Sequence, residues 1–169
     1  KQLHDAHFLA MCNDIVSNSP QSSGVFVVGD IANSGRDYEW KHANELIASV
    51  ARLPKFYFSL GNHDLYGSES YFTLAQNFMT YAQTDSVYYE RVIDGYYHLF
   101  LGSESKSNGL DADLSQNQLS WFDNRMQELT ASQPSKPVFV YLHQSLYDTI
   151  AGSFEGQGWD GIIQNEQFR

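Results

Sequence analysis

The sequence predicts an α/β fold with a mixed sheet, and three observations support this prediction. Short apolar runs typical of buried strands alternate with helix-like segments along the 169 residues. Within residues 24–60 a strand, a helix and a strand form a βαβ unit, in which the strands should be parallel and the crossover right-handed. Two later runs flank Asp94-Gly95, a pair typical of hairpin turns, so antiparallel strands should also occur. We expect one domain, residues 1–169, built as a sandwich flanked by helices.

Composition and charge limit the classes of function. The chain is 42% hydrophobic and 15% aromatic, which is enough for one globular core. Its formal net charge is -10, so binding to a nucleic-acid backbone is not expected. An acidic protein that handles anionic phosphate esters needs cations to offset the repulsion, and bound metal ions are one source.

The single cysteine and the hydropathy pattern exclude other classes. Cys12 lies in an apolar-periodic segment, so a buried thiol is expected, and neither an intrachain disulfide nor a thiolate metal cluster is possible. We find no apolar run of transmembrane length and no signal-peptide pattern at the N-terminus. Few lysines and many Ser, Asn, Gln and Tyr residues favour an exported protein.

The first expected element is a helix over residues 3–16, where apolar side chains recur at helical spacing before Asn18-Ser19-Pro20. His4 and His7 lie one helical turn apart, a spacing that can chelate a metal. Because no third ligand is nearby, we interpret them as part of a solvated helix face.

The βαβ unit places polar residues at the ends of two apolar strands. Residues 25–28 form a continuous apolar run that ends on Gly29-Asp30, and a helix follows that closes near Pro54. Residues 55–60 are a second such run, followed by Gly61 and then Asn62-His63-Asp64. One interpretation of Gly61-Asn62 is an ordinary turn. The other is a ligand site, because parallel strands bring their carboxyl ends to one edge of the sheet, where open α/β sheets bind ligands.

The remaining strands and helices complete the mixed sheet. A helix is expected over residues 69–82, and the hairpin strands over 87–92 and 96–101, with His98 as an ordinary core or surface histidine. The polar loop Ser103 to Asp113 precedes a helix that runs to about residue 131. Ser115 and Gln118 at its start fit a capping box, in which each side chain satisfies a backbone donor.

A third apolar strand repeats the arrangement seen in the βαβ unit. Residues 138–142 form this strand, and His143 follows it directly. Candidate ligands therefore stand at three strand ends: Asp30, Asn62-His63-Asp64 and His143. Chance explains one such end well but three poorly.

The C-terminal part is glycine-rich and aromatic over residues 151–161, and a helix is expected to begin beyond it and run to Arg169. A functional loop and a simple lid are both open interpretations of the Gly152 to Gly161 segment. Phe154 and Trp159 suit packing as a lid better than stacking on a nucleotide base.

Together these residues resemble the calcineurin-like metallophosphoesterases. The motifs that carry the resemblance are Gly29-Asp30, Gly61-Asn62-His63-Asp64, His143 and the helix-starting stretch of residues 114–122. The resemblance covers nearly the whole chain. It implies a four-layer α/β/β/α sandwich and the metal-dependent hydrolysis of phosphoester bonds, as a phosphodiesterase or phosphomonoesterase.

The resemblance also implies roles for individual residues. Asp30 would bridge two divalent metal ions, and Asn62 and His143 would ligate the second of them. His63 would stand beside the leaving oxygen as general acid or hydrogen-bond donor, and Asp64 would orient His63. Asn33 and Gly35 would shape the loop after Asp30. Carboxylate, amide and imidazole ligands suit Mn, Fe or Zn.

The chain departs from the family pattern at both ends. An Asp-x-His motif is expected on a strand before the first helix, and a Gly-His-x-His motif after the last segment, and we expect neither of them anywhere within this chain. At most one weakly held ion is then expected, and this chain alone should be poorly active. We favour a trimmed piece of a complete enzyme, lacking its first strand and its C-terminal strands. The alternative from another class is an inactive binding or scaffold module.

The expected substrate is a phosphoester small molecule or a nucleotide. Which phosphoester it is depends on the loops Ser103 to Asp113 and Gly152 to Gly161, whose sequences do not identify it.

Overall fold

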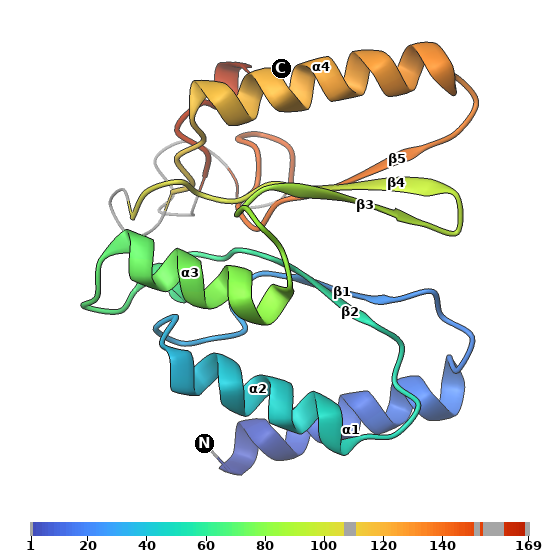
Figure 1. Ribbon diagram of the computed structural model, residues 1–169, viewed down its shortest axis with the longest axis vertical. Helices are drawn as coiled ribbons and strands as arrows, with labels where there is room; N and C mark the ends of the chain where they lie inside the picture. Colours follow the sequence, from blue (N-terminus) through green and yellow to red (C-terminus); the bar gives the residue numbers. More distant parts are fainter. Residues whose placement is uncertain (1, 107–110, 151–152, 154–160, 168–169) are drawn as a thin grey trace.

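The computed structural model describes residues 2–106, 111–150, 153 and 161–167 (Figure 1). Helices and strands alternate along the chain as the sequence predicts. Their bounds are α1 Gln2–Asn18, β1 Val25–Val28, α2 Asp37–Ser49, β2 Phe56–Ser59, the 3-10 helix η1 His63–Leu65, α3 Tyr71–Ala82, β3 Tyr89–Ile93, β4 Tyr96–Phe100, α4 Gln116–Ser132, β5 Val138–Tyr141 and the 3-10 helix η2 Asn165–Gln167.

The strands form two sheets, and both predicted supersecondary units are present. β1 pairs with β2 in parallel, with Val25 opposite Phe56, so the predicted parallel pairing of the βαβ unit is confirmed. In the second sheet β3 pairs antiparallel with β4, and β4 pairs parallel with β5. Asp94 and Gly95 have φ values of 51° and 79°, as a tight hairpin turn between twisted strands requires.

Aromatic side chains join the two sheets face to face. The ring of Phe26 on β1 stacks on His98 of β4 and Tyr141 of β5, with centroids 4.9 and 5.0 Å apart. Phe100 of β4 is fully buried in the same layer, 4.5 Å from the ring of Tyr89. His98 is 6% exposed and is therefore a core histidine. This layer explains why the strands are so rich in aromatic residues.

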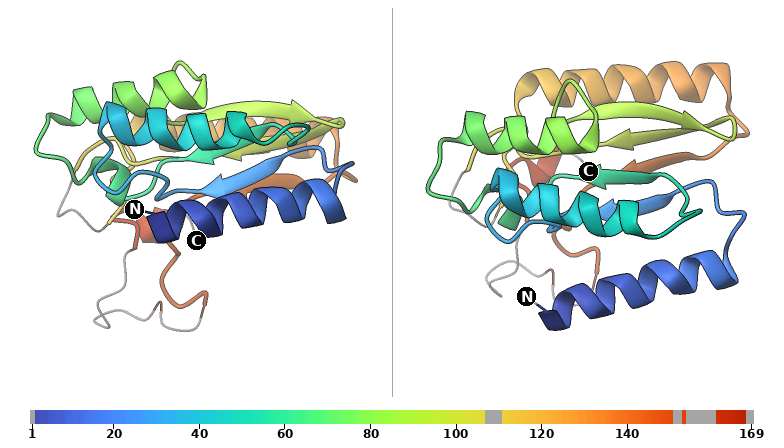
Figure 2. Two further views of the ribbon diagram at one scale, coloured as in Figure 1. Left: turned by 90° about the horizontal axis from the view of Figure 1, so that it is seen from below. Right: turned by 60° about the horizontal axis from the view of Figure 1, so that its bottom comes forward.

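Helices cover the outer faces of both sheets (Figure 1; Figure 2). α1 and α2 lie outside β1 and β2, where Trp40 packs edge-on against Phe58 and Phe78. α4 lies outside the β3-β4-β5 sheet, where Trp121 packs against Tyr88, just before β3, and Arg125 pairs with Glu90 of β3. Cys12 on α1 is fully buried, which confirms its predicted place in the core.

Two strands predicted to be buried are in fact partly exposed. β1 ends on Val28, which is 44% exposed, and β5 carries Phe139 and Val140, each 42% exposed. Within the described residues β1 pairs only with β2 and β5 only with β4, so each strand has one unpaired edge. The apolar runs therefore predict these strands correctly but overestimate their burial.

The start of α4 corrects the predicted capping box. The Oγ of Ser115 accepts from the backbone N–H of Gln118, as predicted. The reciprocal bond is absent among the described residues: the N–H of Ser115 donates to Glu104 instead. The Gln118 amide is fully buried and bonds both the N–H and the carbonyl of Gly102. Gln118 thus ties α4 to the end of β4 rather than capping its own helix.

The C-terminal part only partly matches the prediction of a helix up to residue 169. Its described residues form the short η2, and Ile162 makes a parallel bridge to Ala112. Residues 154–160, including Phe154 and Trp159, lie outside the described residues, as do 107–110 of the predicted substrate loop. Within the described ranges, we find no helix with the length and apolarity needed to cross a membrane.

Candidate metal centre

The loop after β1 turns sharply to present Asp30. Gly29 and Asp30 have φ values of 82° and 59°, a left-handed conformation that glycine adopts freely and aspartate tolerates. A methyl group on Gly29 would lie 2.6 Å from the Nδ1 of His143 and 2.7 Å from the Cα of Gly61. Only glycine fits here, because the ends of β1, β2 and β5 converge on this point.

The carboxylate of Asp64 holds the two loops of the βαβ unit together. Its Oδ2 accepts from the N–H groups of Asp30 and Gly61 at 3.0 and 2.8 Å, and its Oδ1 accepts from Ala32 at 2.9 Å. The side chain is fully buried. Burial raises the pKa of Asp64 to about 7 and the charge of Asp30 acts in the same direction, whereas the three N–H donors favour the carboxylate.

The expected role of Asp64 in orienting His63 stays a prediction. In the described structure the carboxylate of Asp64 bonds backbone N–H groups, and we find no hydrogen bond from it to the imidazole of His63. The sequence neighbours His63 and Asp64 point to different partners as the chain enters η1. The hydrogen bonds of Asp64 thus hold the two loops together.

His143 completes the site from the end of β5. Its Nδ1 lies 2.7 Å from the carbonyl oxygen of Val28. A carbonyl can only accept, so Nδ1 carries a proton, and this fixes the tautomer of the neutral ring. The other ring nitrogen, Nε2, lies 3.0 Å from the Oδ1 of Asn62 and 3.4 Å from the Oδ2 of Asp30.

These three atoms form a set of acceptors that face one another. In the neutral tautomer the Nε2 of His143 has a lone pair, and it faces the amide oxygen of Asn62 and the carboxylate of Asp30. A proton on Nε2 or a metal ion in its place satisfies all three. Two ligands at about 2.1 Å from one ion lie about 3.0 to 3.4 Å apart at octahedral or tetrahedral angles, which matches this spacing.

His63 stands at the edge of this group. Its backbone N–H donates to the Oδ1 of Asp30 at 3.0 Å, and its ring lies against Tyr66 with centroids 4.2 Å apart. Its side chain and that of Asp30 line a cleft of about 780 Å³ between α1, α2 and the loop after β1. His63 therefore lies beside Asp30 at the wall of this cleft.

The comparison with known families agrees with this geometry. Residues 4–167 match the family described as calcineurin-like phosphoesterase. The chain belongs to the calcineurin-like phosphoesterase family. A comparison with curated proteins found no match. At the level of the family, membership implies hydrolase activity on phosphoesters and dependence on metal ions, and the mixed α/β architecture is consistent with the phosphoesterase fold.

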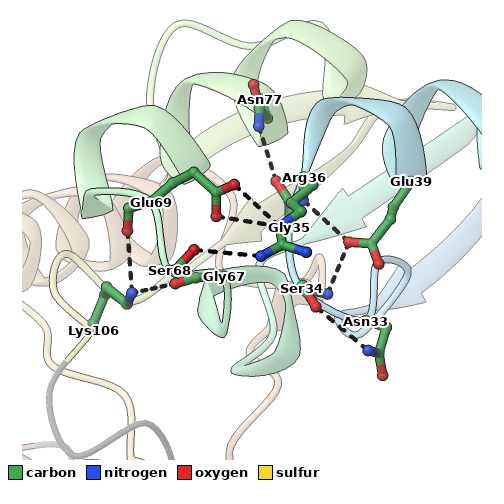
Figure 3. A network of polar contacts seen from close by, with 10 residues as sticks. All are labelled: Asn33, Ser34, Gly35, Arg36, Glu39, Gly67, Ser68, Glu69, Asn77 and Lys106. Carbon is green, nitrogen blue, oxygen red and sulfur yellow. Dashed lines mark hydrogen bonds and ion pairs between the residues drawn. The ribbon is translucent and has the colours of Figure 1, made fainter.

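A polar network joins the loop after β1 to the segment that follows η1 (Figure 3). Arg36 donates through Nε to both carboxylate oxygens of Glu69, at 3.0 and 3.3 Å. Lys106 donates to the carbonyl oxygens of Gly67 and Glu69. Gly35 lies at the centre: a methyl group there would be 1.8 Å from the carbonyl oxygen of Asp64. Gly35, expected to shape the loop, does so by packing directly on Asp64.

Two residues that line the cleft, Asp5 and His42, are not among the predicted site residues. They contact each other, with Nε2 and Oδ1 3.1 Å apart. The expectation that no Asp-x-His occurs in this chain is wrong, because Asp5-Ala6-His7 has these letters. It lies inside α1, however, and not at a strand end. His4 and His7 are exposed, which confirms the solvated helix face.

The predicted metal ligands are brought together by three separate strands. Within the described residues no cluster of three His, Cys, Asp or Glu side chains is suited to hold a metal. The acceptor set consists of two such side chains, Asp30 and His143, and the amide of Asn62. Tyr66 was not predicted, and no signal in the sequence distinguishes it from an ordinary turn residue.

Proposed function

We propose that this chain carries the core of a phosphoesterase site, in which Asp30, Asn62 and His143 hold a divalent cation. The observation that supports this most is the convergence of Asp30 and Asn62 oxygens on the Nε2 of His143, within 3.4 Å. Carboxylate, amide and imidazole donors suit Mn, Fe or Zn. A bound cation would polarise a phosphoryl oxygen and activate a water molecule.

The protein residues supply orientation and proton transfer. Val28 keeps the proton of His143 on Nδ1, so that Nε2 stays free to ligate. His63 is our candidate for the group that gives a proton or hydrogen bond to the leaving oxygen, since it lines the cleft beside Asp30. Asp64 keeps the loops in register through its three backbone bonds.

We also propose that the complete site is dinuclear, with Asp30 shared by two ions. The described residues supply three ligands for one ion, so one weakly held ion is expected in this chain. The order of α1–α2, β1–β2, β3–β5 and α4 in space supports the four-layer α/β/β/α arrangement as a finer assignment (Figure 1). The net charge of -10 favours a small phosphoester over a nucleic acid as substrate.

Hydrolysis assays test the proposal. A chromogenic phosphodiester and a phosphomonoester are incubated with Mn²⁺, Fe²⁺ or Zn²⁺ and either this chain or the full product of its gene. We expect metal-dependent hydrolysis, weak in this chain, that is lost in Asp30→Asn and His63→Ala. His7→Ala, an exposed change on α1, is the matched control. Hydrolysis that persists in the first two variants contradicts the site, and no hydrolysis with any metal favours the inactive binding module.

A further inference from the structure

Tyr66 contacts two members of the candidate site at once. It follows η1 directly and is 40% exposed. Its hydroxyl accepts a hydrogen bond from the Nδ2 of Asn62 at 2.8 Å. Its ring lies on the imidazole of His63, with centroids 4.2 Å apart and planes tilted by 35°. One side chain thus contacts a proposed metal ligand and the proposed proton donor.

The contact with Asn62 bears on how the amide faces the cation. An asparagine side chain can ligate a metal through oxygen only, and turning the amide by half a turn would present its NH₂ group instead. With Nδ2 donating to Tyr66, Oδ1 points at His143. Asn62 is only 7% exposed, so water has little access to replace the phenol as acceptor. Such outer partners of metal ligands typically change metal affinity by about 10–100-fold.

The contact with His63 affects how the imidazole is oriented toward the leaving group of a bound substrate. An aromatic ring packed against an imidazole restricts the rotation of that imidazole. A fixed orientation is what a group that gives a proton to a leaving alkoxide needs.

We propose that Tyr66 is a positioning residue of this site: its hydroxyl sets the amide of Asn62 with oxygen toward the cation, and its ring sets the imidazole of His63. The part concerning His63 rests on the proposed function. The part concerning Asn62 rests on the cation site and on the amide orientation alone.

Two substitutions separate the two contacts. Tyr66→Phe removes the hydroxyl and keeps the ring, whereas Tyr66→Leu removes both. Tyr96→Phe is the control, because Tyr96 is exposed to a similar extent, 41%, on β4 and packs on Phe139. Since Tyr66 lies at the surface, we expect all three variants to fold.

Mn²⁺ affinity is the first measurement. We expect both Tyr66 variants to bind Mn²⁺ roughly 10–100-fold more weakly than wild type, and Tyr96→Phe to bind it equally well. In hydrolysis assays at saturating Mn²⁺, Tyr66→Phe should keep the kcat of the wild type, while Tyr66→Leu should lower kcat and leave KM unchanged, because the imidazole of His63 has lost the ring that restricts its rotation. Wild-type Mn²⁺ affinity in Tyr66→Phe overturns the proposal.

A measurement without metal keeps this proposal separate from the proposed function. The side-chain amide protons of Asn62 are followed by NMR in the metal-free chain. In wild type the hydrogen bond to Tyr66 should slow their exchange with water, and Tyr66→Phe should accelerate it. If wild type binds no Mn²⁺ the proposed function fails, but faster exchange in Tyr66→Phe still supports the role of Tyr66. Unchanged exchange overturns it.

Discussion

Asp64 shows how a single residue can serve a site without touching the substrate. Its buried carboxylate receives three backbone N–H groups from two loops, so it determines how Asp30 and Gly61 lie relative to each other. The sequence reveals that Asp64 follows His63 but not where its side chain points. The hydrogen bonds of Asp64 to backbone donors follow from the turn into η1, which the sequence does not reveal.

Replacing Asp64 by Asn should destabilise the fold. An amide has one accepting oxygen, so its NH₂ group would face at least one of the three backbone donors. Leaving that buried donor unsatisfied costs about 1–3 kcal/mol. Chemical denaturation measures the change in the free energy of unfolding, with Asp123→Asn on the exposed face of α4 as control. An unchanged stability would mean that the backbone bonds of Asp64 contribute nothing.

His98 should make stability depend on pH. Burial lowers its pKa from the ordinary 6.5, so the folded chain keeps this ring neutral where the unfolded chain already takes up a proton. Stability present above pH 6.5 is therefore lost as the pH falls from there through the folded pKa. The hydroxyl of Tyr141 is the near polar partner, 3.0 Å away, and Arg91 is the cross-strand neighbour.

The measurement compares wild type with His98→Phe, which keeps a flat ring in the stack. Free energies of unfolding are taken at about pH 7.5 and about pH 5.5. Wild type should lose more stability on acidification than the variant. Equal losses would show that His98 does not titrate differently in the folded state.

At the scale of elements, the loop after β1 packs directly on the backbone of Asp64 through Gly35. Gly35 has a φ of 67° and no room for a side chain. Gly95 has a φ of 79°, but a methyl group there would meet only the Nζ of Lys136, at an ordinary contact distance of 3.7 Å. The ion pair of Arg36 with Glu69 braces the same loop from outside, but both side chains are more than a third exposed. Such pairs contribute little, so packing at Gly35 should matter more.

Alanine substitutions at the two glycines test this difference. Gly95→Ala should cost only the left-handed backbone term, about 1–2 kcal/mol. Gly35→Ala should cost about 1–3 kcal/mol more, because the methyl group displaces the backbone of Asp64. It should also weaken Mn²⁺ binding, whereas Gly95→Ala should not. Equal effects in denaturation and metal titration would contradict the packing role.

The elements were largely predictable, and their surroundings were not. Apolar runs, the Asp94-Gly95 turn and helical spacing predicted every strand and the four α-helices to within a few residues. The burial of β1 and β5 was overestimated because an apolar run does not say whether a neighbour covers its edge. The predicted bond from the N–H of Ser115 to the side chain of Gln118 does not form, because the amide of Gln118 bonds the backbone of Gly102 instead.

For the whole molecule, the aromatic layer between the sheets determines whether the strand ends converge. Phe100 is fully buried there, between the rings of Tyr89 and Tyr141 at 4.5 and 4.7 Å. Phe100→Ala should cost about 3–5 kcal/mol of unfolding free energy and weaken Mn²⁺ binding as His143 moves away from Asn62. A loss of stability without any loss of Mn²⁺ affinity would show that the sheets are not what positions the site.

The meeting of Asp30 and Asn62 was predictable, because they follow parallel strands that share a sheet edge. His143 follows β5 of the other sheet, and it joins them because the two sheets pack face to face. Two aspects of the site were beyond sequence reasoning. The tautomer of His143 depends on the carbonyl of Val28, which belongs to a strand 115 residues earlier. The contact of Tyr66 with Asn62 and His63 depends on the tight turn of η1, which brings side chains three and four residues apart together.

The most direct test of the central claim is equilibrium binding of Mn²⁺ to the 169-residue chain. Wild type is compared with Asp30→Asn and His143→Ala, with Asp123→Asn as control and circular dichroism as the check on folding. Our account predicts one saturable site in wild type and in the control, with affinity at least about tenfold lower in the other two variants. Equal affinity in folded Asp30→Asn and His143→Ala, or no saturable binding in wild type, would contradict it.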